Sequence, residues 1–280
     1  MSTAFLFPGQ GSQCLGMGAD LFDQFPDEVS SAKNILGFDL SDLCINDPEA
    51  KLGQTQYTQP ALYLVSYLDA LRTGEEQGPP AMAAGHSVGE FAALAYSGAC
   101  SFLDGLKMVS RRGEIMSQVS GGGMAAVIGL EEAGIMEILN EQGLEGVDLA
   151  NFNSPGQIVI SGPAEQIESS LVPLKDGGAR LVVPLKVSGA FHSRMMKEPA
   201  HQFAEFLKDF NFSAPEFPVY ANVTAQPYPH AGIISETLVK QIYSPVRWTE
   251  TILAMKSSGA DDFMECGPGK VLTKLLRQIS

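Results

Sequence analysis

The pentapeptide Gly85-His86-Ser87-Val88-Gly89 constrains the fold of this chain more than any other stretch. It follows a short apolar run at residues 81–84 and precedes an apolar-periodic stretch at residues 90–96. A Gly-x-Ser-x-Gly sequence between a buried strand and a helix is typical of a nucleophile elbow. There the glycines permit a sharp reversal and leave the serine hydroxyl exposed. We therefore expect Ser87 to be a nucleophile; an ordinary strand-to-helix turn is the alternative.

Length, charge and cysteine usage narrow the class of protein. A chain of 280 residues suits one large domain or two unequal ones. The net charge of −14 argues against nucleic acid or an anionic membrane surface as the main partner. No Cys-x-x-Cys spacing is present, which favours reduced thiols over disulfides or zinc at Cys14, Cys44, Cys100 and Cys266. Because no basic signal-peptide region and no run of ~20 apolar residues occurs, we expect a cytoplasmic protein with no membrane partner. Because the cysteines are scattered and the histidines are not clustered, we also expect no metal.

A glycine-rich loop follows the first predicted strand. The apolar run at residues 4–7 predicts a buried strand, and residues 8–13 predict the loop. No Gly-Lys-Ser/Thr follows, so the loop is not a Walker phosphate loop. Its glycines expose backbone N–H groups and Gln10 adds an amide donor, which suits recognition of an anion or a carbonyl oxygen. A plain strand-to-helix turn is again the alternative.

The helix predicted at residues 102–118 carries an arginine on its apolar face. Arg112 lies three residues after Val109 and four before Met116, whereas Arg111 is rotated off that face. A buried guanidinium needs an anion, because an unpaired buried charge costs several kcal/mol. Two partners remain open: an internal Asp or Glu, or a substrate carboxylate held by the bidentate fork of the guanidinium.

The pattern changes beyond the glycine-rich, hinge-like linker at residues 120–123. Strand and helix signals then follow the order βαββαβ, which is the split βαβ or ferredoxin-like arrangement. The predicted strands are 124–130, 147–152, 157–161 and 179–187, and the predicted helices are 131–142 and 164–174. We therefore predict an inserted small subdomain at residues 124–186, with residues 1–123 and 187–280 forming the large one.

Of the four histidines, His192 is the best placed to act as a base. It follows a predicted strand end and Gly189, where an imidazole can face a cleft. His86 adjoins the elbow serine and should be turned away from it by the reversal. His201 falls in an amphipathic helix and His230 in a proline-rich loop. A structural, partly buried imidazole is the alternative for His192.

Several short motifs occur in a fixed order across almost the whole chain. They are Phe7-Pro8-Gly9-Gln10-Gly11-Ser12-Gln13, Gly85-His86-Ser87-Val88-Gly89-Glu90, Arg112-Gly113 with Met116, Asn153-Ser154-Pro155-Gly156-Gln157, Gly189-Ala190-Phe191-His192-Ser193, Pro245-Val246-Arg247-Trp248 and Glu265-Cys266-Gly267-Pro268-Gly269. In this order they resemble the malonyl-CoA:acyl carrier protein transacylases of fatty acid and polyketide synthesis. The order makes the resemblance specific, although each motif alone is short.

The resemblance implies an α/β fold in which an α/β-hydrolase-like large subdomain is interrupted by the ferredoxin-like one, with the active site between them. It implies that Ser87 is the nucleophile and His192 its general base. The oxyanion hole would be the backbone N–H groups of Gln10 and Val88. Substrate binding is implied for Arg112, which would hold the malonyl carboxylate, and for Phe191, Met116 and Gln241. In this family a backbone carbonyl near residues 241–245 holds the second histidine nitrogen, where a hydrolase would use a carboxylate.

The implied reaction transfers a malonyl group from malonyl-CoA to the phosphopantetheine thiol of an acyl carrier protein through a malonyl-serine intermediate, with no metal or other cofactor. Malonyl-selective members tend to carry Ala-Phe-His where methylmalonyl-selective members carry Ala-Ser-His, so Phe191 predicts a preference for malonyl. The chain resembles the free-standing members of the family, and we expect a monomer. An acidic carrier would need a local positive surface, for which the candidates are Lys175, Arg180, Lys186 and Lys197.

Two other functions remain open. One is a thioesterase-like acyl hydrolase on the same scaffold, and the other is a non-catalytic module that binds carrier proteins. A hydrolase would admit water and would need no fixed cation for the acyl group, so Arg112 favours transfer. A non-catalytic module has no physical need for a serine at an elbow that faces a histidine.

Overall fold

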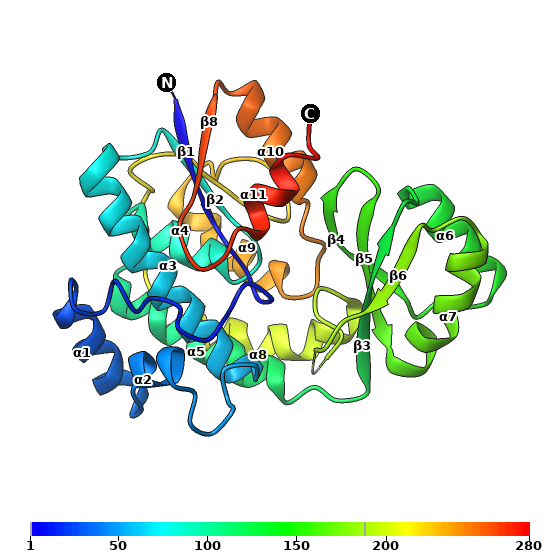
Figure 1. Cartoon of the computed structure of the whole chain (residues 1–280), viewed down its shortest axis with the longest axis horizontal. Helices are drawn as coiled ribbons and strands as arrows, with labels where there is room; N and C mark the ends of the chain where they lie inside the picture. The colour runs from blue at the N-terminus through cyan, green and yellow to red at the C-terminus, as the bar shows by residue number, and fades with distance from the viewer. Residues whose placement is uncertain (1, 188) are drawn as a thin grey trace.

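The computed structural model describes residues 2–187 and 189–280 and contains two four-stranded sheets, one parallel and one antiparallel. The parallel sheet and most helices form the larger part of the molecule, and the antiparallel sheet lies beside it with α6 (Glu132–Glu141) and α7 (Ala164–Asp176) (Figure 1). Met1 and Ser188 lie outside the described residues. Within the two described ranges, no helix is long and apolar enough to cross a membrane.

The parallel sheet has the strand order β7-β2-β1-β8. Its strands are β1 (Thr3–Phe7), β2 (Met82–Gly85), β7 (Val219–Tyr220) and β8 (Asp262–Glu265). In this register Phe7 lies beside Gly85, the last residue of β2. Because parallel strands end at the same edge of a sheet, the glycine-rich loop after β1 and the elbow after β2 are neighbours.

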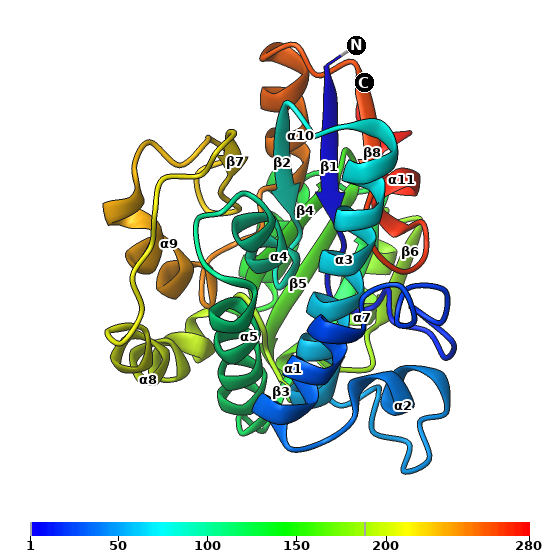
Figure 2. The ribbon, with the colours of Figure 1, turned by 90° about the vertical axis from the view of Figure 1, so that its left-hand side faces the viewer.

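Alternate residues of β1 are buried on opposite faces of this sheet. Phe5 and Phe7 pack into the large core with α3 (Thr55–Gln77), α4 (Gly89–Tyr96) and α5 (Phe102–Ser117). Ala4 and Leu6 pack on the other face against α10 (Trp248–Ser257) and α11 (Val271–Leu276). The short parallel sheet is thus covered on both sides, as its apolar strands require (Figure 2).

In the described residues, four more helices belong to the part of the molecule with the parallel sheet. They are α1 (Pro26–Leu36), α2 (Leu40–Ile45), α8 (Lys197–Leu207) and α9 (Ile234–Gln241), with single 3-10 turns at Arg194–Met196 and Ala231–Ile233. Phe203 of α8 packs edge-on against Phe91 of α4, with 6.1 Å between ring centroids. This contact fixes the segment that follows His192 against the elbow helix.

The antiparallel sheet has the strand order β4-β5-β3-β6. Its strands are β3 (Gly122–Ile128), β4 (Asp148–Ser154), β5 (Gln157–Pro163) and β6 (Leu181–Pro184), and α6 (Glu132–Glu141) and α7 (Ala164–Asp176) pack on it around their own apolar cluster. The predicted α/β fold class with a βαββαβ second sheet is confirmed. The subdomain boundaries at residues 124 and 186 stay a prediction.

The two sheets are joined through β4. Val246, in the loop between α9 and α10, donates its N–H to Ala150 O and accepts at its own carbonyl from Phe152 N, each at 2.9 Å. The loop therefore pairs with the edge strand β4 through one parallel bridge, between Val246 and Asn151. The same loop contacts His192, so it joins the antiparallel sheet to the parallel-sheet part of the molecule next to the predicted active site.

Some element boundaries differ from the prediction. α3 continues to Gln77 and has Pro60 inside it, although residues 73–80 contain the Gly and Pro residues typical of a surface loop and Pro is common in the first turn of a helix. Tertiary packing explains the extension: α3 approaches α4 so closely at Gly74 that a Cβ there would overlap the Tyr96 hydroxyl. The predicted linker at residues 120–123 is shorter, because Gly122 already belongs to β3 and packs tightly against Ala190.

We expect Gly85→Ala to lower the free energy of unfolding by about 2–3 kcal/mol, because the new Cβ would overlap the Gly89 carbonyl group across the elbow. Urea denaturation followed by circular dichroism measures the change. The matched control is Gly53→Ala, at a glycine with open space around its Cα, which should shift the value by less than ~0.5 kcal/mol. Equal stability of the two variants would contradict the close approach at the elbow.

Candidate active site

The elbow places Ser87 at the reversal between β2 and α4. Its φ of 52° lies in the left-handed region, which residues other than glycine rarely adopt. Close packing explains the following Gly89, since a Cβ there would overlap the carbonyl oxygen of Phe7. Asn222 braces the turn: its Oδ1 accepts from Ser87 N at 2.7 Å and its Nδ2 donates to Gly85 O at 2.6 Å. The predicted strand, turn and helix around Ser87 are confirmed.

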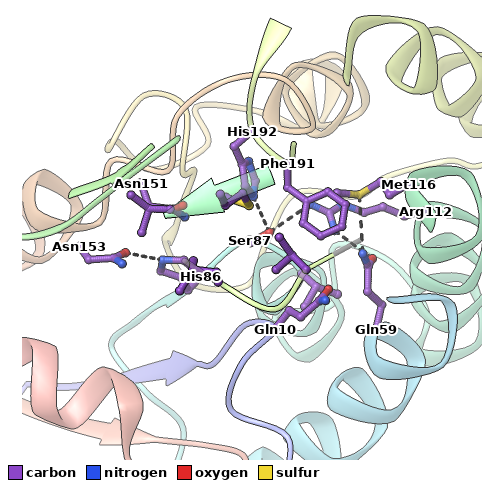
Figure 3. Close-up of a pocket in the computed structure, with 15 residues that line it drawn as sticks. Gln10, Gln59, His86, Ser87, Arg112, Met116, Asn151, Asn153, Phe191 and His192 are labelled. Atoms are coloured by element: carbon purple, nitrogen blue, oxygen red, sulfur yellow. Dashed lines mark hydrogen bonds between the residues drawn. The ribbon is translucent and has the colours of Figure 1, made fainter. Parts of the chain in front are cut away.

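His192 faces the Ser87 hydroxyl, with 2.7 Å between Nε2 and Oγ (Figure 3). Its Nδ1 lies 2.9 Å from the carbonyl oxygen of Gln241 and 3.1 Å from that of Ser244. Carbonyl oxygens only accept hydrogen bonds, so we assign the proton to Nδ1. Nε2 is then free to accept the Ser87 proton, which is the arrangement that a general base needs.

The electrostatic surroundings keep His192 neutral. Burial and, after it, the positive charge of Arg112 lower the pKa of its imidazole to about 3. At neutral pH the ring is therefore unprotonated and able to accept a proton. The hydrogen bonds from Nδ1 to the two carbonyls oppose this shift, since they favour the protonated ring.

The other three histidines lie where the sequence predicted them. The elbow turns His86 away from Ser87, and its Nε2 lies 2.9 Å from Oδ1 of Asn153 in β4 (Figure 3). His201 is exposed on α8, and His230 is exposed before the 3-10 turn at Ala231–Ile233. The geometry brings His192 alone of the four to the serine.

Arg112 is buried beside the pair, with only 1% of its surface exposed. Its guanidinium donates to the Oε1 atoms of Gln59 and Gln241, each at 2.9 Å, and to Ser87 Oγ at 3.2 Å. Its Nε has no hydrogen-bond partner. Burial lowers its pKa to about 10, so the guanidinium keeps its charge at neutral pH.

No carboxylate neutralises this cation. The ion pairs within residues 2–187 and 189–280 do not include Arg112, and its acceptors are two neutral amides and a hydroxyl. Glu90 raises the pKa of Arg112 through its charge, but the Glu90 carboxylate binds other donors. The alternative of an internal ion pair for Arg112 is therefore wrong, and the site has room for an external anion.

A cavity of about 140 Å³ opens over these groups and is lined by residues of both parts of the molecule. Gln10 and Val88 line it, and neither backbone N–H donates to a protein acceptor within the described residues. Met116 and Phe191 line it on the Arg112 side (Figure 3). Gln241 does not line it: this residue lies behind Ser87 and contacts Arg112 from the core.

A second, wider hollow of about 740 Å³ lies on the other side of His192. Its cationic lining comes from Arg194, Lys197 and Arg247, of which Arg194 pairs with Asp148 and Arg247 with Glu250. The other predicted carrier-docking cations are exposed on or near the small sheet, at Lys175, Arg180 and Lys186.

Sequence reasoning missed three residues that hold the site: Gln59, Glu90 and Asn222. Glu90 carried a usable signal, because it is an acid in a helix that is otherwise apolar and buried up to its last residue. Gln59 and Asn222 carried none, since their contacts reach across 53 and 135 positions of the chain. Side-chain amides of this kind become visible only once the fold brings them together.

The arrangement is equipped for nucleophilic acyl transfer to a hydroxyl beside a fixed cation. Ser87 and His192 form an activated nucleophile, and the guanidinium can hold an acyl group that ends in a carboxylate. Within the described part of the chain, no group of three or more His, Cys, Asp and Glu side chains is arranged to hold a metal ion.

Comparisons with known proteins agree with this chemistry. The acyl transferase domain family matches residues 4–279. The polyketide biosynthesis malonyl CoA-acyl carrier protein transacylase PksC of Bacillus subtilis (strain 168) is 46% identical over 279 residues, which cover 98% of this chain and 96% of PksC. The polyketide biosynthesis protein ThaF of Burkholderia thailandensis is 52% identical over 277 residues, but this chain spans only 24% of its length.

A solved structure shows the same fold. It is the complex of a type II polyketide-synthase acyl carrier protein with its malonyl-transacylase, and its matching chain has a TM-score of 0.94 and 39% sequence identity. The match covers 100% of this chain and 93% of that one.

We expect the reactivity of Ser87 toward a serine-directed sulfonyl fluoride to stay nearly constant between pH 8 and pH 5, because the pKa of His192 lies at about 3. A histidine with an ordinary pKa of 6.5 would be about 97% protonated at pH 5 and would lose reactivity roughly thirtyfold. Mass spectrometry of the modified serine gives the rate, and circular dichroism at each pH checks the fold. A fall in rate centred near pH 6.5 would contradict the buried, neutral imidazole.

Proposed function

The chain belongs to the acyl transferase family, and we propose that Ser87, His192 and Arg112 carry out its transfer of a malonyl group from malonyl-CoA to an acyl carrier protein. The observation that carries this proposal is the buried Arg112 guanidinium, 3.2 Å from the Ser87 hydroxyl and without a carboxylate partner in the described residues. In a malonyl ester of Ser87, one methylene separates the ester carbon from the carboxylate, which puts the carboxylate within reach of this cation.

In the first half-reaction, His192 Nε2 takes the proton of Ser87 as Oγ attacks the malonyl thioester carbon. The tetrahedral oxyanion lies at the backbone N–H groups of Gln10 and Val88. As the intermediate collapses, the carbon–sulfur bond breaks and the coenzyme A thiolate receives the proton from His192. The malonyl group remains as an ester on Ser87, with its carboxylate on Arg112.

In the second half-reaction, the phosphopantetheine thiol of the carrier replaces coenzyme A. His192 accepts the thiol proton, sulfur attacks the ester carbon, and Ser87 leaves as its hydroxyl after it regains the proton. Each group that the steps require is a side chain or backbone amide of this protein, which supports a reaction with no cofactor besides the substrates.

The remaining assignments follow from the lining of the cavity. Phe191 and Met116 border the space beside Arg112, which supports malonyl over methylmalonyl, because an extra α-methyl would meet the Phe191 ring. A clash of one methyl group is worth about 1–3 kcal/mol of discrimination. Gln241 serves substrate binding through Arg112, which it contacts, rather than by lining the cavity.

A thioesterase-like hydrolase on this scaffold is the second candidate. It would not need a fixed cation 3.2 Å from the nucleophile, so Arg112 supports transfer over hydrolysis. A non-catalytic carrier-binding module fits less well still, because Ser87 and His192 are already in hydrogen-bond contact. We propose that the protein works in the reducing cytoplasm, which its four free cysteines support. We also propose a monomer, with the carrier entering past Lys197 beside His192.

An assay with malonyl-, methylmalonyl- and acetyl-CoA, with and without a phosphopantetheinylated carrier protein, tests the function. We expect malonyl-carrier to be the main product and methylmalonyl transfer to be at least about tenfold slower. The acyl-enzyme should be visible by mass spectrometry and absent in Ser87→Ala. Rapid release of free malonate without carrier, and no malonyl-carrier with it, would instead identify a hydrolase.

We expect Arg112→Ala to lower kcat/KM for malonyl-CoA by about 10²–10³, because removal of one partner of a buried charge pair costs roughly 2–5 kcal/mol. Acetyl-CoA has no carboxylate, so its transfer should fall much less and the malonyl preference should shrink. Arg111→Ala is the matched control, since this neighbour is partly exposed and pairs with Glu114. An unchanged ratio of malonyl to acetyl transfer in Arg112→Ala would refute the carboxylate role.

A further inference from the structure

Glu90 is a fully buried carboxylate directly behind the nucleophile, and the steps above do not use it. Its Oε2 accepts from the backbone N–H of Asn222 at 3.1 Å and from Gln241 Nε2 at 2.7 Å. Its Oε1 accepts from the Tyr228 hydroxyl. Burial raises the pKa of this carboxyl to about 7 against the opposing effect of these hydrogen bonds. A buried acid with this many dedicated donors needs a reason, because a neutral side chain would avoid the desolvation cost.

The contact with Gln241 supplies that reason. Gln241 has one amide oxygen and one amide nitrogen, and the nitrogen is committed to two acceptors, Glu90 Oε2 and the Ser87 carbonyl oxygen at 3.0 Å. The oxygen is thereby turned toward the Arg112 guanidinium, 2.9 Å away. A flipped amide would set its NH₂ group against the guanidinium, which only donates, and would lose the hydrogen bonds to both acceptors. Glu90 therefore helps to fix the orientation of the Gln241 amide, so that its oxygen and not its nitrogen faces Arg112.

We propose that Glu90 is a positioning residue for acyl-group specificity, which acts through the Gln241 amide to hold the Arg112 guanidinium beside Ser87. This proposal rests on the proposed function of Arg112 as the partner of the malonyl carboxylate. The amide spacer keeps Glu90 out of ion-pair contact with Arg112, so the cation is held in place without being neutralised.

We call the hydrogen-bonded series Glu90, Gln241 and Arg112 the relay. The contacts of Arg112 indicate what its loss would do. Gln59 would still accept from the guanidinium, so Arg112 would stay buried but could pivot about that contact. The Ser87–His192 pair would be less affected, because the backbone carbonyls of Gln241 and Ser244 hold His192 independently of the Gln241 side chain. Malonyl transfer should suffer while transfer of a neutral acyl group continues.

A double-mutant cycle with Glu90→Met and Gln241→Met tests the relay. Each single variant should lower kcat/KM for malonyl-CoA about tenfold, mainly through a higher KM, and should lower acetyl-CoA transfer by clearly less, so that the malonyl-to-acetyl ratio falls at least about threefold. Because the two residues act in series, the double variant should lose little more than either single one. Losses that multiply, or that fall equally on malonyl- and acetyl-CoA, would overturn the proposal in favour of a merely structural role.

Two milder variants keep the test decisive should Glu90→Met not fold. Glu90→Gln can still accept from Asn222 N and Gln241 Nε2 while its NH₂ donates to the Tyr228 oxygen, so the malonyl preference should stay within about threefold of wild type. Tyr228→Phe removes the hydrogen bond to the other carboxylate oxygen, and it should lower the melting temperature without changing the preference. Loss of the preference in either variant would overturn the relay.

The same assay separates this proposal from the one on which it rests. If Arg112→Ala keeps the malonyl preference, the carboxylate role and the relay are both wrong. If Arg112→Ala loses the preference while Glu90→Met and Gln241→Met keep it, only the relay is wrong. The relay is supported when all three lose the preference.

Discussion

The whole site depends on two residues whose backbones are held in the left-handed region, Ser87 at φ 52° and His192 at φ 58°. Such a conformation costs a side-chain-bearing residue of order 1–3 kcal/mol, so it persists only where the surroundings determine it fully. Asn222 holds the first through two hydrogen bonds. The backbone of His192 is held by its N–H, which donates to Ile242 O at 3.2 Å, and by the hydrogen bonds of Nδ1 to the carbonyl oxygens of Gln241 and Ser244. Burial of the surrounding core supplies the free energy that maintains both strained turns.

A second constraint is the uncompensated charge beside these turns. The guanidinium of Arg112 is one cause of the low pKa of His192, after burial, so the cation and the base oppose each other in the free protein. In the function that we propose, a malonyl carboxylate on Arg112 would offset that charge. The imidazole would then become a stronger base when an acyl group of the right charge is in place, which would couple recognition of the acyl group to proton transfer.

Sequence reasoning found the residues whose signals are local. Ser87 was marked by its glycines, Arg112 by its place on an apolar helix face, and His192 by the strand end and glycine before it. The βαββαβ order was readable because each element has its own hydrophobic period. The end of α3 could not be predicted from the sequence, because its last turns are held by contact with Tyr96. Tertiary packing of this kind overrides a local turn signal. Gln59 and Asn222 could not be predicted for a related reason: their roles depend on partners that are distant in sequence. Glu90 did carry a local signal, as an acid in a buried apolar helix, but its partners are equally distant.

The loop between α9 and α10 links these levels of structure. Within a few residues it supplies the Gln241 and Ser244 carbonyls that fix the tautomer of His192, and Val246, which bridges to β4. β4 in turn contributes Asn151 and Asn153 to the cavity wall. A displacement of the small sheet would pull on Val246 and so on the carbonyls that orient the imidazole. The antiparallel sheet therefore does more than line the cavity. Its edge strand β4 and His192 contact the same segment of backbone, so the cavity wall and the base are positioned together.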